Sequence, residues 1–432
     1  MMVFVSLGFC SANKSLYLGK ICETLKIERA AFSVNDSLRF VTQAIINLFF
    51  GALLHKLGAK KMIAVGFGFL ILAMLTYANA DKIYSLAHTW LNHGQPAKDL
   101  KNAVFVFYVG GVMLGIGLSL TSTTVASSLV RRWFTQNIGT YTSIVFAANG
   151  LGGALAAQIV SPMINSGAFG YKKAYNFVAI LLLVIGVLTV IFLKEKPKDA
   201  PDVVVSTKKK ARGASWIGID SKTALRQPFF YMAAAVVLLT GFSLQGINGI
   251  WSTHMEDVGI SDTFTKNLAT FYSIFLTMTK LIVGALYDRK GLRNVMLICQ
   301  SAGAVAFIAL AITSDTIFGK SAAIAFSILY ALALPLETLV IPLIANELFG
   351  SAAYDKLLGI LLAMNYSGYA LGGPIVNLFF KHFRDYKQIL TILAILTAGL
   401  LVSFQFVINM ANKKKAAVLA AAACEETEPA KN

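Results

Sequence analysis

Two lysines lie in segments that are otherwise apolar enough to cross a membrane. Lys14 lies in SLGFCSANKSLYL near the start of the chain, and Lys280 lies well inside FYSIFLTMTKLIVGAL. A lysine at the centre of a bilayer costs about 2.5–3.5 kcal/mol, and such residues usually face a watery cavity. An ammonium group held there could bind an anion. The alternative is that each lysine extends along its helix to the membrane interface.

The composition indicates that most of the chain lies in a membrane. Hydrophobic residues make up 56% and charged residues 14% of the 432 residues. A soluble domain cannot bury that much apolar surface, so a polytopic membrane protein is expected. Long, uniformly apolar runs predict helices rather than the alternating strands of a barrel. The net charge of +17 collects in particular loops, which favours membrane topology over nucleic-acid binding.

The apolar runs predict an all-α protein with twelve transmembrane helices in two groups of six. We expect a six-helix bundle at 1–193, a cytoplasmic linker at 194–227, a second bundle at 228–411 and a disordered cytoplasmic tail at 412–432. The individual spans are predicted at residues 1–19, 36–56, 61–80, 102–130, 136–164, 172–193, 228–254, 264–287, 293–313, 318–349, 355–381 and 386–411.

The distribution of charge predicts the orientation in the membrane. Lysine and arginine are more numerous in the loops on the linker side, which places both termini in the cytoplasm. The first residues lack a basic region and a cleavage site, so they predict a first helix rather than a signal peptide, and a start further upstream stays open. We expect a multi-pass protein of the plasma membrane, and the short tails favour a prokaryotic source. The scattered cysteines and histidines show no metal-binding or catalytic spacing, so neither an enzyme nor a cofactor or metal is expected.

Two loops repeat one pattern, one in each half of the chain. The first, GALLHKLGAKK, begins at Gly51, and the second, GALYDRKGLRN, begins at Gly284. A glycine at the end of a span lets two helices approach closely. The second glycine of each loop, Gly58 or Gly291, permits a tight turn. The repetition predicts that the two halves are related by duplication.

Charged residues near these loops are candidates for contacts that close one end of the molecule. Basic residues would hold the loops at the cytoplasmic surface and pair with carboxylates at neighbouring helix ends. Glu347, at the inner end of the tenth span, is one such carboxylate. The candidate gating residues are Gly51, Gly58, Arg132, Gly284, Asp288, Arg289, Gly291, Arg293 and Glu347.

The repeated loops resemble the signature loop G-x-L-x-D-R-x-G-R-R of the major facilitator superfamily. With the twelve spans and the central linker, the resemblance covers essentially the whole chain. It implies two six-helix pseudo-repeats that move a solute by alternating access. His55 stands where the family usually has aspartate, whereas Asp288 keeps the carboxylate. The first half therefore lacks that acidic partner for a salt bridge at its inner end.

Two further stretches resemble the monocarboxylate porters and oxalate/formate antiporters of that superfamily. Residues 6–33 are similar to the first helix and loop of that branch, which has a lysine late in the helix, here Lys14. An R-W-F tripeptide at Arg132 is followed by the glycine-rich AANGLGGAL at 147–155. The branch also has a cation four residues before the glycine of the second loop, here Lys280, and the resemblance implies that it contacts a substrate carboxylate.

Two departures from that branch bear on the substrate. Proton-coupled animal members have an acidic residue where this chain has Leu276, and oxalate exchangers have a lysine in the eleventh span, where this chain has Asn365, Tyr366 and Tyr369. A monocarboxylate such as lactate, pyruvate or formate is therefore favoured over a dianion. An oxalate/formate-type exchanger and a porter for a non-carboxylate solute stay open. Symport and antiport are not distinguished.

Polar residues at helical spacing are expected to line a central cavity with the lysines. Ser273, Thr277, Lys280 and Gly284 follow one another at the spacing of a single stripe. The alternative is that such residues only join helices, at about 0.6 kcal/mol per contact. Interfacial exposure is the default expectation for Arg39. The candidate substrate-binding residues are Lys14, Lys280, Arg39, Gln245, Asn248, Thr277, Asn365 and Tyr366.

A buried acid in the tenth span has two readings. Glu337 could form an ion pair with Lys280, or it could carry a coupling proton. The expected partners are accordingly a small organic anion, the lipid bilayer and a coupling proton or counter-anion. We expect a monomer that binds no nucleic acid.

Overall fold

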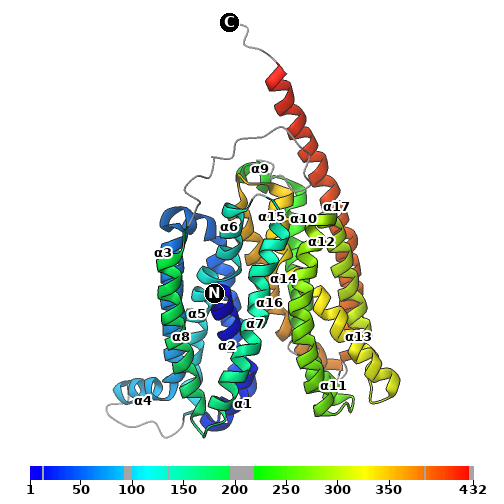
Figure 1. Ribbon diagram of the computed structural model, residues 1–432. Helices are drawn as coiled ribbons and strands as arrows, with labels where there is room; N and C mark the ends of the chain where they lie inside the picture. The colour runs from blue at the N-terminus through cyan, green and yellow to red at the C-terminus, as the bar shows by residue number, and fades with distance from the viewer. Residues whose placement is uncertain are drawn as a thin grey trace.

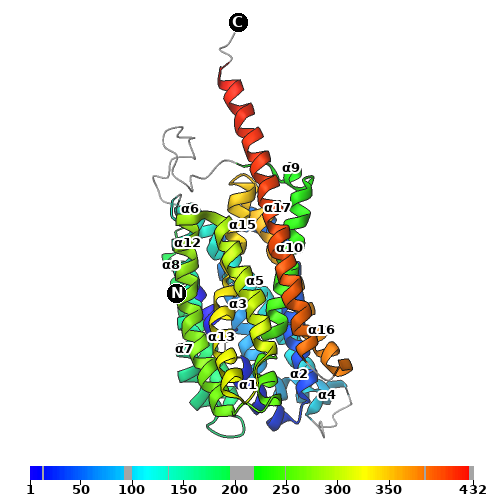
Figure 2. The same ribbon diagram turned by 90° about the vertical axis from the view of Figure 1, so that its right-hand side faces the viewer.

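The computed structural model describes residues 1–11, 14–91, 100–134, 136–194, 218–248, 250–383 and 386–427. Every regular element in these ranges is a helix, and Figures 1 and 2 show most of the long helices running along one common direction. This confirms the all-α fold class. Helices are required because lipid offers no hydrogen bonds to an exposed backbone.

The first half of the chain begins with a short π-helix and then continues in helices of varied length. Its elements are η1 (Phe4–Phe9), α1 (Lys14–Leu25), α2 (Arg29–Leu48), α3 (Phe50–Ala78), α4 (Ala80–Leu91), η2 (Lys101–Ala103), α5 (Val104–Thr121), α6 (Thr123–Trp133), α7 (Ile138–Ile164) and α8 (Gly170–Phe192).

The second half begins with a short helix at the end of the linker. Its elements are α9 (Ser221–Leu225), α10 (Pro228–Asn248), α11 (Trp251–Asp257), α12 (Asp262–Ala311), α13 (Ile317–Ala333), α14 (Pro335–Thr338), α15 (Val340–Phe349), α16 (Tyr354–Phe383) and α17 (Tyr386–Thr427).

Eight helices of the described ranges are long and apolar enough to cross a membrane. One of them, α12, contains two of the predicted spans, so these eight account for nine of the twelve. The other three predicted spans coincide with η1 and α1, with α2, and with α16. The segments η1 and α1 are each too short to cross a membrane. Helices α2 and α16 are long enough but carry charged and polar residues, such as Asp36 and Arg39 in α2.

Two glycines turn the chain inside α3 and α12. Gly58 has φ 74° and ψ 160°, and Gly291 has φ 77° and ψ 174°. Residues with a Cβ atom rarely adopt such angles. The tight turns predicted from the repeated loops are therefore present in both halves.

Several helix boundaries differ from those predicted. The second span begins earlier than expected, at Arg29, and the fourth is divided at Ser122 between α5 and α6. The tenth is divided into α13, α14 and α15, and α14 begins at Pro335. Proline lacks the N–H that would continue the helical hydrogen bonds, so it favours a break at this point.

The structure describes only the two ends of the predicted linker. Residues 195–217 of the predicted linker lie outside the described ranges. After them, Asp220 caps α9 by accepting hydrogen bonds from the backbone N–H groups of Lys222 and Thr223, at 3.0 and 3.3 Å. Hydrogen bonds from the Thr223 hydroxyl and backbone N–H hold the pKa of Asp220 below its ordinary value.

The predicted disordered tail is largely helical. Helix α17 continues through Thr427 and extends beyond the rest of the bundle (Figure 1), and residues 428–432 lie outside the described ranges. The segment KKKAAVLAAAA has the alanine and lysine content of a strong helix former, which favours a helix here despite the polar residues at its ends.

The buried apolar residues form two clusters that follow the two halves. One cluster consists of residues between Val5 and Leu182, and the other consists mostly of residues between Ile219 and Ala411. The second cluster also includes Phe40, Ala126, Ile138 and Phe146 of the first half, where the two halves meet. In Figure 1, α3, α5 and α8 lie on one side of the molecule and α10, α12 and α13 on the other.

The halves meet mainly through two helix pairs, α7 with α12 and α2 with α16. In the first pair the backbones almost touch. A Cβ atom on Gly284 would collide with the carbonyl oxygen of Gly139 and with Ser143. The first glycine of the second repeated loop is therefore required for close packing between the halves.

A carboxylate of the second half caps a helix of the first half. Asp288 accepts hydrogen bonds from the backbone N–H groups of Gly139 and Thr140, at 2.9 and 2.7 Å, and from the Thr140 hydroxyl at 2.6 Å. The residue before α7, Asn137, makes no capping bond with its own side chain. A negative charge is favoured at a helix N-terminus, so this contact holds the halves together.

A second acidic contact lies at the same end of the molecule, which we call the signature-loop end because it carries the repeated loops. Asp355, in the first turn of α16, accepts a hydrogen bond from the Ser128 hydroxyl at 2.6 Å and lies 3.5 Å from an Arg132 nitrogen. Arg131 donates to the Asn346 side chain at 2.8 Å. Helices α6, α9 and α15 lie at this end, the upper end of Figure 1.

Other charged residues near the repeated loops are exposed or make contacts within their own half. Arg289 and His55 are exposed, and Arg293 donates to Gln405 of its own half at 3.0 Å. Glu347 accepts a hydrogen bond from the Tyr287 hydroxyl at 3.0 Å. Sequence reasoning missed Asp355. Its signal in the sequence is an acidic residue in the first turn of the predicted eleventh span, which could pair with Arg131 and Arg132 at the end of the predicted fourth span.

Replacing Gly291 by alanine is expected to destabilise the protein by about 1–3 kcal/mol, because its backbone angles are almost restricted to glycine. Gly399→Ala is a matched control. An added Cβ atom meets nothing within 4 Å at either position, but Gly399 is helical. Thermal unfolding in detergent should show a lower midpoint for G291A and an unchanged or higher midpoint for G399A. Equal midpoints for the two variants would contradict the backbone argument.

Asp288→Asn should loosen the signature-loop end, because an amide oxygen replaces a carboxylate that accepts three hydrogen bonds. Hydrogen bonds to charged groups contribute about 1.5–3 kcal/mol, so the amides of Gly139 and Thr140 should exchange about tenfold faster or more. Hydrogen–deuterium exchange with mass spectrometry measures this directly. Asp315→Asn is the control, because Asp315 forms an exposed ion pair with Lys320. Unchanged exchange in D288N would argue against the cap.

Candidate functional site

Lys280 is more deeply buried than Arg39, the other cation of the predicted site whose side chain the structure describes. It lies on α12, and only 3% of its surface is exposed. Its ammonium group makes no hydrogen bond, and no ion pair within 4.0 Å, with any residue that the structure describes. The acid that interacts with it electrostatically is Glu337. The ion pair with Lys280, one of the two readings of Glu337, is therefore not formed in this structure.

Glu337 lies in α14, next to the break at Pro335, and is 6% exposed. The Tyr369 hydroxyl interacts with its carboxyl group, whereas its Oε1 atom has no hydrogen-bond partner among the described residues. The Asn365 side-chain nitrogen donates to the Glu337 backbone carbonyl at 3.2 Å. The broken helix thus presents both a side chain and a backbone carbonyl to α16.

Arg39 is buried, with 6% exposed, and does not extend to the interface as expected. Its guanidinium group donates to the Ser11 hydroxyl at 2.8 Å and lies 3.2 Å from an Asp36 oxygen. It also lies over the Phe40 ring, 4.2 Å from its centroid. Ser11, which follows η1, and Asp36, one turn earlier on α2, compensate the positive charge of Arg39. The guanidinium group can therefore remain inside the protein.

Aromatic side chains connect the buried groups of the two halves. The Phe40 ring centroid lies 6.5 Å from that of Tyr366 and 5.1 Å from that of Tyr369. Tyr366 interacts electrostatically with both Arg39 and Glu337. We call the following residues the central cluster: Arg39, Phe40, Lys280, Glu337, Asn365, Tyr366 and Tyr369.

The structure brings together only some of the candidate binding residues. Lys280, Arg39, Asn365 and Tyr366 belong to the central cluster, as does Glu337. Gln245 is half-buried and Asn248 is exposed, and neither makes a hydrogen bond to the cluster within the described ranges.

Two other candidates cannot be added to the central cluster. Thr277 donates back to the Ser273 carbonyl at 3.3 Å and lies against Gly150 of α7, so it serves helix packing. Lys14 begins α1, and its side chain lies outside the part of the chain that the structure describes.

Sequence reasoning missed the contributions of Asp36 and Phe40. Asp36 precedes Arg39 by three residues, a spacing that places the two on one helix face, so this pair could have been found. Phe40 carried no such signal, because one aromatic residue in an apolar helix does not show which partner helix it faces.

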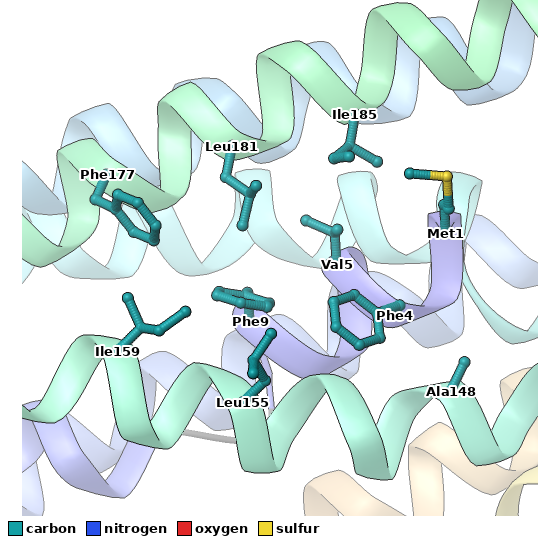
Figure 3. A pocket seen from close by; sticks show the side chains of 10 residues that line it. All are labelled: Met1, Phe4, Val5, Phe9, Ala148, Leu155, Ile159, Phe177, Leu181 and Ile185. Atoms are coloured by element: carbon teal, nitrogen blue, oxygen red, sulfur yellow. The ribbon is translucent and has the colours of Figure 1, made fainter.

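Two apolar cavities lie away from the central cluster. The first, with a volume of about 380 Å³, is lined by ten residues of the first half, including Phe9, Leu155 and Leu181 (Figure 3). The second, of about 350 Å³, lies between α3 and α8. Neither is lined by a charged side chain, and the cations of the central cluster are buried by the helices around them.

Comparisons with known proteins agree on the family. The family described as Major Facilitator Superfamily matches residues 2–253 and 233–423. The chain is similar to the MFS-type transporter pynF of Aspergillus niger, with 23% identity over 299 residues. That match covers 68% of this chain and 59% of pynF, so the chain spans less than two thirds of that relative's length.

Solved structures of similar shape are also transporters. A double-tryptophan mutant of XylE, a proton:xylose symporter, has a TM-score of 0.72 and 13% identity, with 94% of each chain covered. The Escherichia coli fucose:proton symporter FucP has a TM-score of 0.67 and 14% identity, over 94% of this chain and 97% of that one. The nucleoside transporter NupG has a TM-score of 0.59 and 17% identity, over 94% and 98%.

At these identities the structural matches establish the fold and not the substrate. The resemblance to the monocarboxylate branch therefore stays a prediction. The family match extends over nearly the whole chain and agrees with the two repeated loops, the all-helical fold and the interface between the halves. The chain belongs to the major facilitator superfamily of membrane transporters.

Proposed function

We propose that this transporter carries small monocarboxylates, with Lys280 as the group that binds the carboxylate. The observation that carries the proposal is a lysine with 3% of its surface exposed and no direct partner among the described residues. A buried charge is retained only where something compensates it, and an unpaired one costs several kcal/mol. A bound anion would compensate Lys280 and so lower the energy of the closed, substrate-loaded state.

The arrangement of charge favours one carboxylate over two. Lysine acts as a point charge with three donors, which suits a single carboxylate group. Arg39 already has Asp36 and Ser11 as partners. Lys280 is therefore the cation of the central cluster that is available to bind an anion. A dianion would bring a second negative charge close to Glu337. This supports a monocarboxylate over an oxalate-type substrate.

Transport is proposed to follow from alternating access of the two bundles, residues 1–193 and 228–411. The contacts of Asp288 and Asp355 close the signature-loop end, and the charge distribution supports a cytoplasmic position for it. Both termini would then be cytoplasmic, in a protein of the plasma membrane. Release of these two contacts would let the halves rock about the central cluster and open it to the other side.

Glu337 is the proposed site of proton coupling. It is buried beside Lys280 and has one unpartnered oxygen, so a proton on that oxygen would remove a buried negative charge. Proton symporters for xylose and fucose share the fold, which supports proton coupling in this architecture but does not identify the residue. A counter-anion is the alternative coupling partner.

Lys280→Gln and Lys280→Ala should each reduce uptake of a radiolabelled monocarboxylate into proteoliposomes by at least tenfold, because a charged hydrogen bond worth about 1.5–3 kcal/mol is lost. Lys320→Gln is the control, since Lys320 pairs with Asp315 in an exposed position. Competition by lactate, formate, oxalate and a sugar defines the substrate class. Uptake equal to that of the natural sequence in both Lys280 variants would remove this residue from the mechanism.

Glu337→Gln should separate exchange from proton-driven accumulation. An amide cannot take up and release the proton, so accumulation driven by a pH gradient should be lost, while counterflow between two substrate pools should continue. Glu256→Gln, at an exposed position on α11, should affect neither measurement. If E337Q still accumulates substrate in response to the gradient, the coupling proton is carried elsewhere.

A further inference from the structure

Helix α4 carries large apolar side chains that point away from the rest of the protein. Ile83, Leu86 and Trp90 follow one another at i, i+3 and i+7, so they share one face of the helix. All three are exposed, and the exposed fractions of Leu86 and Trp90 reach 74% and 83%. Water disfavours this much apolar surface on one short helix, so the face requires an apolar partner.

A polar strip runs beside this apolar face. Lys82, Ser85 and Thr89 have the same spacing but precede the apolar residues by one position, which places them about 100° around the helix. With 12 residues, α4 is too short to cross a bilayer. A short helix with one apolar and one polar face is typical of a helix that lies in the interface between membrane and water.

Helix α4 is held at the level where membrane-spanning helices reach the water. Only Asn79 separates it from the end of α3, and it contacts η2 and α5. Lys172, near the start of α8, forms an ion pair with Asp81 in the first turn of α4 at 2.6 Å. In Figure 1, α4 runs across the direction of the long helices, at the end opposite the signature-loop end. Its position therefore corresponds to the depth of the lipid headgroups.

The neighbouring helices also present apolar residues to lipid at this end. Leu75 lies near the end of α3 and Phe105 near the start of α5, and both are exposed although these helices are long and apolar enough to cross a membrane. Helix α4 contacts both helices. The apolar face of α4 is therefore an extension of the surface that the bundle already presents to lipid.

A protein partner fits this face less well than lipid does. At about 150–250 Å² for each large side chain, three side chains offer less than the roughly 800 Å² that each partner buries in a stable protein interface. The membrane interface sets no such minimum. It also suits Trp90, because an indole ring is apolar but its N–H group can reach the headgroups.

We propose that α4 lies in the interface of the leaflet opposite the signature-loop end, with Ile83, Leu86 and Trp90 at the boundary of headgroups and acyl chains. The polar strip then faces water. In the second half, the corresponding connection between α12 and α13 consists only of residues 312–316, which leaves no room for such a helix. Helix α4 therefore fixes the depth of the first half in the bilayer through a contact that the second half does not share at this connection.

Fluorescence quenching in lipid nanodiscs tests this position. Leu86→Cys and Ser85→Cys are each made in the full chain after the four natural cysteines have been replaced by alanine, and each new cysteine is labelled with an environment-sensitive fluorophore. Lipids with a nitroxide near the headgroup should quench the label at position 86 about threefold more strongly, or more, than the label at position 85. Iodide in the water should show the opposite order. Equal quenching at the two positions would overturn the proposal.

Leu86→Asp tests the same contact with the natural cysteines in place. An isolated helix of this length is marginal in water, so α4 should lose protection when it leaves the membrane. Its backbone amides should then exchange about tenfold faster or more in hydrogen–deuterium exchange in nanodiscs. Ser85→Asp is the matched control, because it places the same carboxylate one residue away on the polar strip, and exchange should be unchanged. Exchange in L86D equal to that of the natural sequence would overturn the proposal.

The mass of the nanodisc complex separates lipid from a second copy of the chain. We expect the natural sequence and L86D to have the same oligomeric state by native mass spectrometry. A dimer of the natural sequence that becomes a monomer in L86D, without quenching by nitroxide lipids at position 86, would show that the face binds protein and would overturn the proposal.

Discussion

The absence of water around a charged group is the constraint on which the interior of this protein depends. Lys280 is buried without a direct partner in the described part of the chain, and Arg39 is buried with partners. The helices that surround them must therefore supply compensation or accept it from a ligand. Asp36 and Ser11 compensate Arg39 within the first half, whereas Lys280 has only the indirect influence of Glu337. Because of this difference, Arg39 has a structural role and Lys280 can interact with a ligand.

The backbone is arranged to bring these groups together. The helix break at Pro335 turns Glu337 and its carbonyl toward α16, which carries Asn365 and Tyr369. Phe40 extends the cluster from the first half to the aromatic residues of the second. Close packing of α7 on α12 through Gly139 and Gly284 fixes how near the two halves can approach. The irregular positions of the fold therefore coincide with the interface and the central cluster.

The amino-acid sequence predicts the fold well because lipid leaves few alternatives to long apolar helices, and because Gly58 and Gly291 have a distinct backbone requirement. It also identifies Lys280 and Glu337, since charge is rare in such helices. It does not predict the partners. Burial of Arg39 depends on Ser11 of another element, and the contact between Asp355 and Ser128 joins residues that are far apart in the chain. Such pairs depend on how helices are rotated against each other, which periodicity alone leaves undetermined.

Two carboxylates, Asp288 and Asp355, join the halves at the signature-loop end. Both belong to the second half, and the groups that the structure shows donating to them belong to the first. The halves are repeats in pattern, yet at this boundary they have become complementary rather than equivalent. The first half supplies the hydrogen-bond donors, namely a helix N-terminus, hydroxyl groups and an arginine, and the second half supplies the carboxylates that accept from them. Two first halves or two second halves could not seal this boundary, so a single polypeptide that carries both guarantees correct pairing.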